Sequence, residues 1–198
     1  NINSDIIFNS VKIPSYVSKN NTFTIAFVGN LGSRRRPEIF LDLCSDMTDL
    51  DINFVMCGRN AIDSNLQVKL EKRISMLKNV QYLGEVSQND VYKILSKSHL
   101  MIYTLNHSGL GNVILESWAC KTPVLSIGAD LMKLTGNSEI GLSFNNYKHL
   151  VQYIKDLFID IEKVEILGDL SRKFVSENFS QVAILNKHKE FFSKITNA

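Results

Sequence analysis

The chain of 198 residues is long enough for one domain with a sizeable hydrophobic core. Hydrophobic residues make up 44% of it and charged residues 21%, which is typical of a soluble globular protein. The net charge of +2 gives no general affinity for nucleic acid or membranes, and no apolar stretch is long enough to cross a bilayer.

The cysteines and histidines show no pattern of a disulfide framework or a metal site. Cys44, Cys57 and Cys120 are far apart and each lies in an apolar run, which favours reduced core thiols in a cytoplasmic protein. The four histidines lack metal-ligand spacing, so we expect neither a metal nor a cofactor. Because the chain begins with Asn1 rather than Met, we expect a further portion upstream.

In chain order, residues 1–21 are polar, are interrupted by Pro14, and are expected to form a first strand and a hinge or linker. Beyond them, short apolar runs that mostly end at a glycine alternate with amphipathic segments. The expected strands comprise residues 24–28, 52–57, 80–83, 99–104, 124–127 and 141–144. The expected helices comprise residues 37–47, 62–77, 87–97, 147–160, 162–178 and 181–195, with one more after Gly111. Residues 128–137 are expected to form a loop.

This alternation predicts the α/β class, a Rossmann-like parallel sheet with helices on both faces. We assign residues 22–180 to that domain and residues 181–198 to a C-terminal helix that packs on it or on an upstream domain. Ligands of such sheets bind at the carboxyl ends of the strands. The informative residues are therefore those that follow the strands, at 29–36, 58–59, 84–86 and 106–112.

The most informative stretch begins at His107 and contains a glycine loop followed by a helix. Gly109 and Gly111 let backbone N–H groups approach a ligand, and a helix N-terminus favours phosphate. Glycines at such a turn are about as often only turn formers. Glu116 lies in an otherwise apolar helix and needs a hydrogen-bond donor, either a ligand hydroxyl or a neighbouring Arg or Lys. Together they suggest a nucleotide-sugar site.

Three consecutive arginines, Arg34 to Arg36, follow the first strand. They repel one another unless an anion is present, and arginine matches phosphate oxygens with two donors. A solvated charge run is the alternative interpretation. The sequence contains no Walker A motif, no serine between the glycines as in a nucleophile elbow, and no dehydrogenase glycine pattern after the first strand.

Several segments in fixed order resemble a known family. They are residues 27–31 (FVGNL), 54–58 (FVMCG), 80–86 (VQYLGEV), 108–116 (SGLGNVILE) and 119–124 (ACKTPV). Their spacing resembles the C-terminal, donor-binding half of the retaining GT-B glycosyltransferases of family four (glycosyl transferases group 1). The resemblance covers about residues 5 to 195, and residues 7–14 look like the hinge between the two halves.

The resemblance implies a hexosyltransferase-type enzyme that takes a nucleotide-diphosphate sugar and transfers the sugar, with retention, to a glycan or polysaccharide precursor. It implies an N-terminal acceptor domain upstream, no nucleic-acid partner, and membrane contact only through that upstream half. The implied location is cytoplasmic, or peripheral at the inner membrane. The alternatives are a non-catalytic nucleotide-sugar-binding module, and another GT-B enzyme such as a nucleotide-sugar epimerase.

The resemblance also implies roles for individual residues. Arg35 falls where the family usually carries a diphosphate-binding lysine, and Glu116 on the glutamate that holds the ribose hydroxyls, so both are candidate catalytic residues. Asn30 replaces a usual arginine, with Arg34 or Arg36 near enough to compensate, and Ser108 replaces a glutamate that contacts the sugar. The remaining candidate substrate-binding residues are Gly29, Gly58, Arg59, Gly84, Glu85, Val86, His107, Gly109, Leu110, Gly111 and Asn112.

Overall fold

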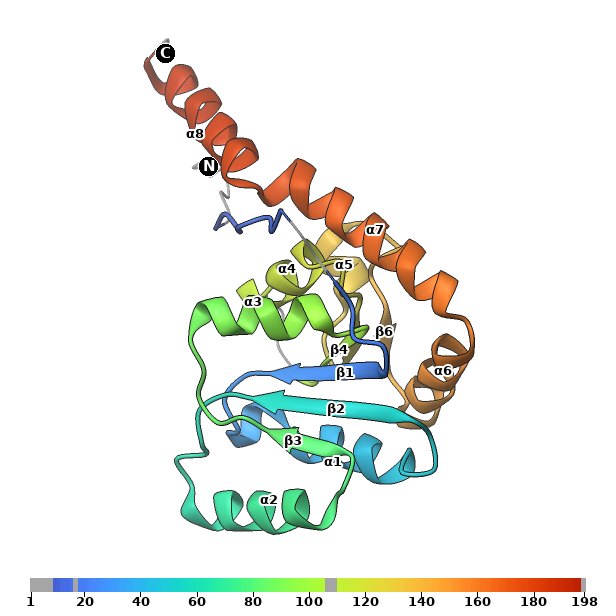
Figure 1. Cartoon of the computed structure of the whole chain (residues 1–198). Coiled ribbons are helices and arrows are strands. Elements are labelled where there is room, and N and C mark those ends of the chain that lie inside the picture. Colours follow the sequence, from blue (N-terminus) through green and yellow to red (C-terminus); the bar gives the residue numbers. More distant parts are fainter. Residues whose placement is uncertain (1–8, 16–17, 106–109, 197–198) are drawn as a thin grey trace.

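The computed structural model describes residues 9–15, 18–105 and 110–196. A six-stranded parallel sheet forms its centre, with the strand order β3-β2-β1-β4-β5-β6. The strands are β1 (Phe23–Val28), β2 (Ile52–Cys57), β3 (Val80–Tyr82), β4 (Leu100–Tyr103), β5 (Val124–Ile127) and β6 (Ser143–Phe144). Helices cover both faces (Figure 1), which confirms the predicted Rossmann-like fold.

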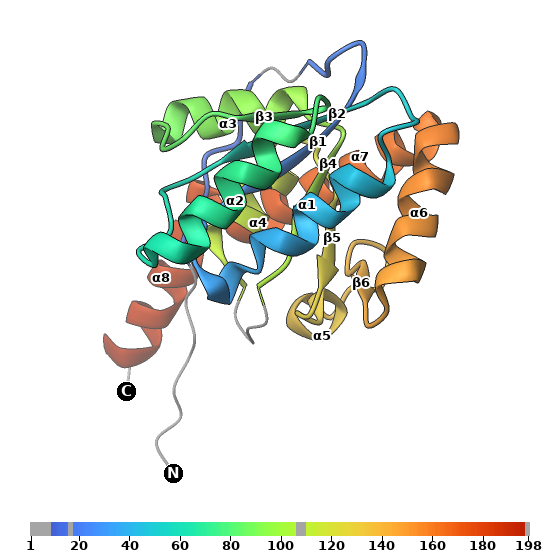
Figure 2. The ribbon, with the colours of Figure 1, turned by 90° about the horizontal axis from the view of Figure 1, so that it is seen from below.

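The helices divide between the two faces of the sheet. On one face lie α1 (Pro37–Asp46), α2 (Ser64–Met76) and α6 (Tyr147–Ile159), which Figure 2 shows from below. On the other lie α3 (Gln88–Lys97) and α4 (Asn112–Ala119), while α7 (Ile161–Phe179) contributes to both cores. A short 3-10 helix, η1 (Ser33–Arg35), precedes α1, and α8 (Gln181–Thr196) extends away from the sheet (Figure 1).

The strands are apolar on both sides because successive side chains enter different cores. Phe27 and Phe54 pack against Phe40 of α1, with ring centroids 5.3 and 5.7 Å from it. On the opposite face, Met101 belongs to the core around the fully buried Trp118 of α4. This burial on both faces stabilises the sheet, and because all of its strands are parallel, their carboxyl ends lie at one edge.

The helix starts follow local signals in the sequence. Pro37 is the first residue of α1, as predicted, and the Ser87 hydroxyl caps α3 by accepting from the backbone N–H of Asp90 at 3.2 Å.

The prediction of a loop over residues 128–137 is wrong in part, because the short helix α5 (Leu131–Thr135) lies within this segment. Asp130 caps this helix and Leu131 is fully buried, but five residues are too few to show a helical period.

Two described residues of the expected linker, Val11 and Lys19, contact the domain. The Val11 N–H donates to the Phe179 carbonyl at 2.8 Å, and the Lys19 ammonium donates to Thr122 Oγ1 at 2.7 Å and to the Cys120 carbonyl at 3.1 Å. The first strand expected at residues 6–8 falls outside the described residues. Within the described part of the chain, no helix combines the length and apolar character needed to span a membrane.

Candidate functional site

The loops that follow β1, β2 and β3 are joined by backbone hydrogen bonds at the carboxyl edge of the sheet. The Gly29 N–H donates to Cys57 at 3.0 Å, the Gly58 N–H donates to Gly84 at 2.8 Å, and the Leu31 N–H donates to Arg59 at 2.9 Å. A Cβ on Gly58 would collide with the Gly29 carbonyl, so this approach requires glycine. The edge is therefore a preformed surface.

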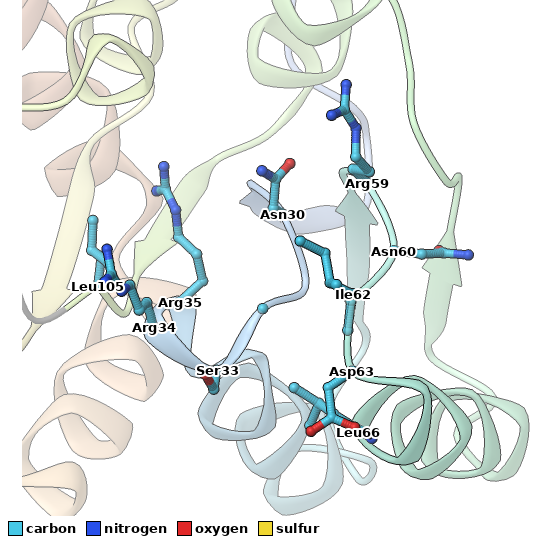
Figure 3. A pocket seen from close by; sticks show the side chains of 12 residues that line it. Asn30, Ser33, Arg34, Arg35, Arg59, Asn60, Ile62, Asp63, Leu66 and Leu105 are labelled. Atoms are coloured by element: carbon cyan, nitrogen blue, oxygen red, sulfur yellow. Dashed lines mark hydrogen bonds between the residues drawn. The ribbon is translucent and has the colours of Figure 1, made fainter.

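A cavity of about 760 Å³ opens between the loops after β1 and β2. Its volume is in the range of small-molecule sites. Figure 3 shows Asn30, Arg35 and Arg59 extending toward the same side of this cavity. Its lining residues are Asn30, Gly32, Ser33, Arg34, Arg35, Arg59, Asn60, Ala61, Ile62, Asp63, Leu66 and Leu105. The cavity is therefore lined both by arginine hydrogen-bond donors and by aliphatic side chains.

Arg35 is held in place by its neighbours. Its Nε would lie 3.3 Å from a Cβ at position 29, so the side chain packs directly on the backbone of Gly29. Its Cζ lies 5.7 Å from the centroid of the buried Tyr103 ring, a cation–π contact. Among the described residues, no carboxylate forms an ion pair with Arg34 or Arg35. Arg34 and Arg35 therefore face the cavity without an ion-pair partner among the described residues, and Asp63 is the one carboxylate among the residues that line it.

Arg36 has a different orientation from its two neighbours. Its Nε donates to the Thr104 carbonyl at 2.6 Å and its Nη2 donates to the Ile127 carbonyl, at the ends of β4 and β5. Its φ of 44° is left-handed, which turns the side chain back under the sheet edge. Arg36 does not line the cavity, and its Nε and Nη2 already donate to carbonyls. Of the three arginines, Arg34 and Arg35 face it.

Glu116 receives a hydrogen bond from an amide. Gln88 Nε2 donates to Glu116 Oε1 at 2.7 Å, and within the described residues no Arg or Lys forms an ion pair with this carboxylate. Burial raises the pKa of Glu116 above its usual range, and the bond from Gln88 opposes that rise. The protein donor to Glu116 is therefore an amide and not the Arg or Lys that the sequence analysis offered as one alternative. Gln88 was not among the predicted site residues.

Arg59 and Glu85 form an exposed ion pair across the ends of β2 and β3, with Nη2 and Oε1 2.9 Å apart. The hydrogen bond from Arg59 lowers the pKa of Glu85. Because both side chains are more than 60% exposed, the pair adds little to stability.

The two neighbours of Glu85 have structural roles. Gly84 has a left-handed φ of 68°, a conformation that favours glycine, and Val86 packs against the core.

The glycine loop is described from Leu110 onward, so His107, Ser108 and Gly109 lie outside the described residues. Gly111 is the N-cap of α4 and provides no side-chain cap. A Cβ on Gly111 would lie 3.4 Å from the Tyr103 hydroxyl, so Tyr103 reaches from Arg35 to the start of α4. Leu110 packs against the core and Asn112 is the first residue of the helix.

The structure brings four of the sequence candidates together in the cavity: Asn30, Arg34, Arg35 and Arg59. Gly29, Gly58, Gly84, Glu85, Val86, Leu110, Gly111, Asn112 and Glu116 belong to neighbouring loops or α4 but do not line the cavity. Residues 60–63 were missed although they follow β2 and so satisfy the strand-end rule. Within the described ranges, no cluster of three or more His, Cys, Asp or Glu could hold a metal ion.

A family model described as glycosyl transferases group 1 matches residues 10–174. The chain is 28% identical over 185 residues to the O-antigen biosynthesis glycosyltransferase WbnH of Escherichia coli, covering 88% of this chain and 49% of that protein. It is similar to Anabaena Alr3699/HepE in complex with UDP-glucose, with a TM-score of 0.72 and 21% identity over 88% of this chain and 49% of the other.

A third similar protein is a C-terminal domain solved alone, that of the glycosyl transferase group 1 family protein LpcC from Francisella tularensis. The TM-score is 0.69 at 16% identity, and the match covers 80% of this chain and 87% of that domain. By contrast, the chain spans about half the length of WbnH and of Alr3699/HepE.

Proposed function

The chain belongs to the glycosyl transferases group 1 family, and on that premise we propose that it is the donor domain of a glycosyltransferase that binds a nucleotide-diphosphate sugar. The observation that carries this proposal is the pair Arg34 and Arg35, which face a cavity of about 760 Å³ and form no ion pair with a described carboxylate. A diphosphate would be the ion-pair partner of these arginines, and each arginine offers it two donors.

The proposed chemistry is stabilisation of a leaving group. When the bond between the sugar and the diphosphate breaks, negative charge develops on the diphosphate oxygens. Arg35, fixed between Gly29 and Tyr103, and the uncapped start of α4 stabilise that charge without reorganising. We propose retention at the anomeric carbon from the family resemblance.

Glu116 is proposed to bind the ribose, and residues 84–86 to meet the base through backbone groups. A carboxylate accepts from two vicinal hydroxyls at once, which suits the 2′ and 3′ positions of a ribose. The partial burial of Glu116 supports this role, because a half-buried carboxylate needs more donors than Gln88 supplies. Ser108, which the family resemblance matches to a sugar-contacting glutamate, is proposed to affect binding of the sugar and not of the nucleotide.

The acceptor site is proposed to lie on an upstream domain. The match covers only 49% of the WbnH protein, which supports a second half of similar size. Helix α8 extends away from the sheet and exposes Val182, Leu185 and Phe192. Val11 pairs with Ser180, the residue directly before α8, so Val11 lies next to the start of this helix. We therefore propose that α8 packs on the upstream domain.

Titration of the 198-residue chain with UDP, GDP and ADP, each beside its nucleoside, tests the proposal. We expect at least one nucleoside diphosphate to bind at least about tenfold more tightly than its nucleoside, since charge-assisted contacts are worth about 1.5–3 kcal/mol. Equal affinities would contradict the diphosphate assignment. Assays with a panel of UDP-, GDP- and ADP-sugars should detect no transfer by this chain alone.

Robust transfer by the isolated chain would contradict the upstream acceptor domain. In the full-length protein, turnover only with an acceptor present is the expected result. Epimerisation of the donor without an acceptor would identify another GT-B enzyme, and binding without any turnover would identify a non-catalytic module.

A further inference from the structure

Gln88 and Glu116 meet across two helices on the same face of the sheet. Gln88 is the first residue of α3, directly after its cap Ser87, and Glu116 lies in the middle of α4. The two are 28 positions apart in sequence, and their side chains are joined by the 2.7 Å bond from Nε2 to Oε1. The bond therefore fixes the carboxylate from outside its own helix.

The type of donor matters for what the carboxylate can bind. An Arg or Lys partner would neutralise Glu116 and take up its acceptor sites, whereas an amide donates one N–H and leaves the negative charge in place. The bond from Gln88 occupies one lone pair on Oε1, and Oε2 has no hydrogen-bond partner among the described residues. The carboxylate is thus oriented and still charged.

We propose that Gln88 is a positioning residue, which holds the Glu116 carboxylate so that Oε2 and the remaining lone pair of Oε1 accept from the vicinal hydroxyls of a nucleotide ribose. This inference rests on the proposed donor-binding function. Gln88 itself does not contact the nucleotide in this arrangement. Its contribution is to keep Glu116 in one rotamer and ionised, so that a ligand meets a preorganised acceptor.

In the part of the chain that the structure describes, two titratable groups interact with Glu116. Tyr92 approaches from α3, and Cys120 lies at the end of α4. Burial raises the pKa of Tyr92 to about 12 and also raises the pKa of Cys120, so both are neutral at pH 7. Loss of the Gln88 donor should therefore raise the pKa of Glu116 further without another described group titrating nearby.

The test uses the 198-residue chain and whichever of UDP, GDP and ADP binds it most tightly, together with the 2′-deoxy form of that nucleotide. Gln88→Ala should weaken the ribonucleotide by about three- to tenfold, the range of one hydrogen bond, and the deoxy form by less. Asn89→Ala is the matched control, because Asn89 is the next exposed residue of the same helix turn and should bind like the parent.

Two further readouts separate positioning from general structure. On lowering the pH, ribonucleotide affinity should fall at a higher pH in Gln88→Ala than in the parent. In a Glu116→Ala background, adding Gln88→Ala should cause no further loss, because the side chain that Gln88 orients is gone. Melting curves of each variant without nucleotide check that the domain remains folded.

The outcomes distinguish this inference from the function on which it rests. If Glu116→Gln binds like the parent, the ribose assignment itself fails. If Glu116→Gln weakens binding but Gln88→Ala does not, only the positioning role is overturned. Equal losses for the ribonucleotide and its deoxy form in Gln88→Ala, with an unchanged pH profile, would also overturn it.

Discussion

Arg36 and Thr104 are joined by a hydrogen bond: Arg36 Nε donates to the Thr104 carbonyl at 2.6 Å, while Thr104 Oγ1 donates to the carbonyl of the preceding residue, Arg35. These bonds join the loop after β1 to the end of β4. The sheet order reverses between these two strands, which is where α/β sheets open for ligands. The backbone of Arg35 is consequently anchored at the point where its side chain faces the cavity.

Replacement of Arg36 should therefore affect stability. We expect Arg36→Ala to lower the free energy of unfolding by about 2 kcal/mol, because two strand-end carbonyls lose a charged donor. Urea unfolding measures this, and Arg34→Ala should remain within about 0.5 kcal/mol of the parent since Arg34 is exposed. Parent-like stability in Arg36→Ala would show that these contacts contribute nothing.

Arg35→Ala should affect ligand binding selectively. We expect the affinity for the tightest nucleoside diphosphate to fall by about 1.5–3 kcal/mol, and the affinity for the matching nucleoside to change little. Calorimetric titration of both ligands measures the difference, with Arg34→Ala as the neighbouring comparison in the same cavity. Equal losses for both ligands would make Arg35 a structural residue.

The sequence predicted the sheet well because its strands are buried on both faces and appear as apolar runs that end mostly at glycine, as at Gly29 and Gly58. The start of α1 was predicted from Pro37 and the cap of α3 from Ser87, both of which act locally. These signals also predicted the edge of the sheet at which the cavity opens.

The direction of individual side chains could not be predicted in the same way. Three adjacent arginines look alike in sequence, yet the left-handed φ of Arg36 turns it toward β4 and β5. Gln88 was missed because its partner Glu116 is brought near only by the packing of α3 on α4. Contacts between distant segments depend on the assembled sheet, which local patterns do not encode.

Lys19 should make stability depend on pH. Burial lowers its pKa to about 7, and Lys121 nearby lowers it as well. Because the unfolded lysine has a pKa of about 10.4, the unfolded chain binds more protons between about pH 7 and pH 10, and stability rises with pH in that window. The free energy of unfolding relative to Lys19→Met should thus increase by roughly 1–2 kcal/mol between pH 7 and pH 9.

Urea titrations of the parent and Lys19→Met at several pH values measure this difference, and the comparison cancels the titration of thiols that both chains share. The variant also loses the bonds to Thr122 and Cys120, so it should be less stable than the parent at the upper end of the range. A constant difference across the range would show that Lys19 is charged in the folded chain.

Glu116→Gln should stabilise the unliganded chain at neutral pH. Burial raises the pKa of Glu116, so the folded chain binds more protons than the unfolded chain just above the ordinary glutamate pKa, and its stability falls as the pH rises through that window. Glutamine is nearly isosteric, carries no charge to desolvate, and its amide oxygen still accepts from Gln88 Nε2.

We expect the melting temperature of Glu116→Gln to exceed that of the parent at pH 7.5, and the gain to shrink as the pH is lowered through the raised pKa of Glu116. The same variant should lose about 1–3 kcal/mol of nucleotide affinity, the pattern of a residue kept for binding at a cost in stability. Glu85→Gln is the control, because Arg59 lowers the pKa of Glu85 and its replacement should bring no gain. A lower melting temperature for Glu116→Gln at every pH would mean that the carboxylate is satisfied inside the protein and is not held for a ligand.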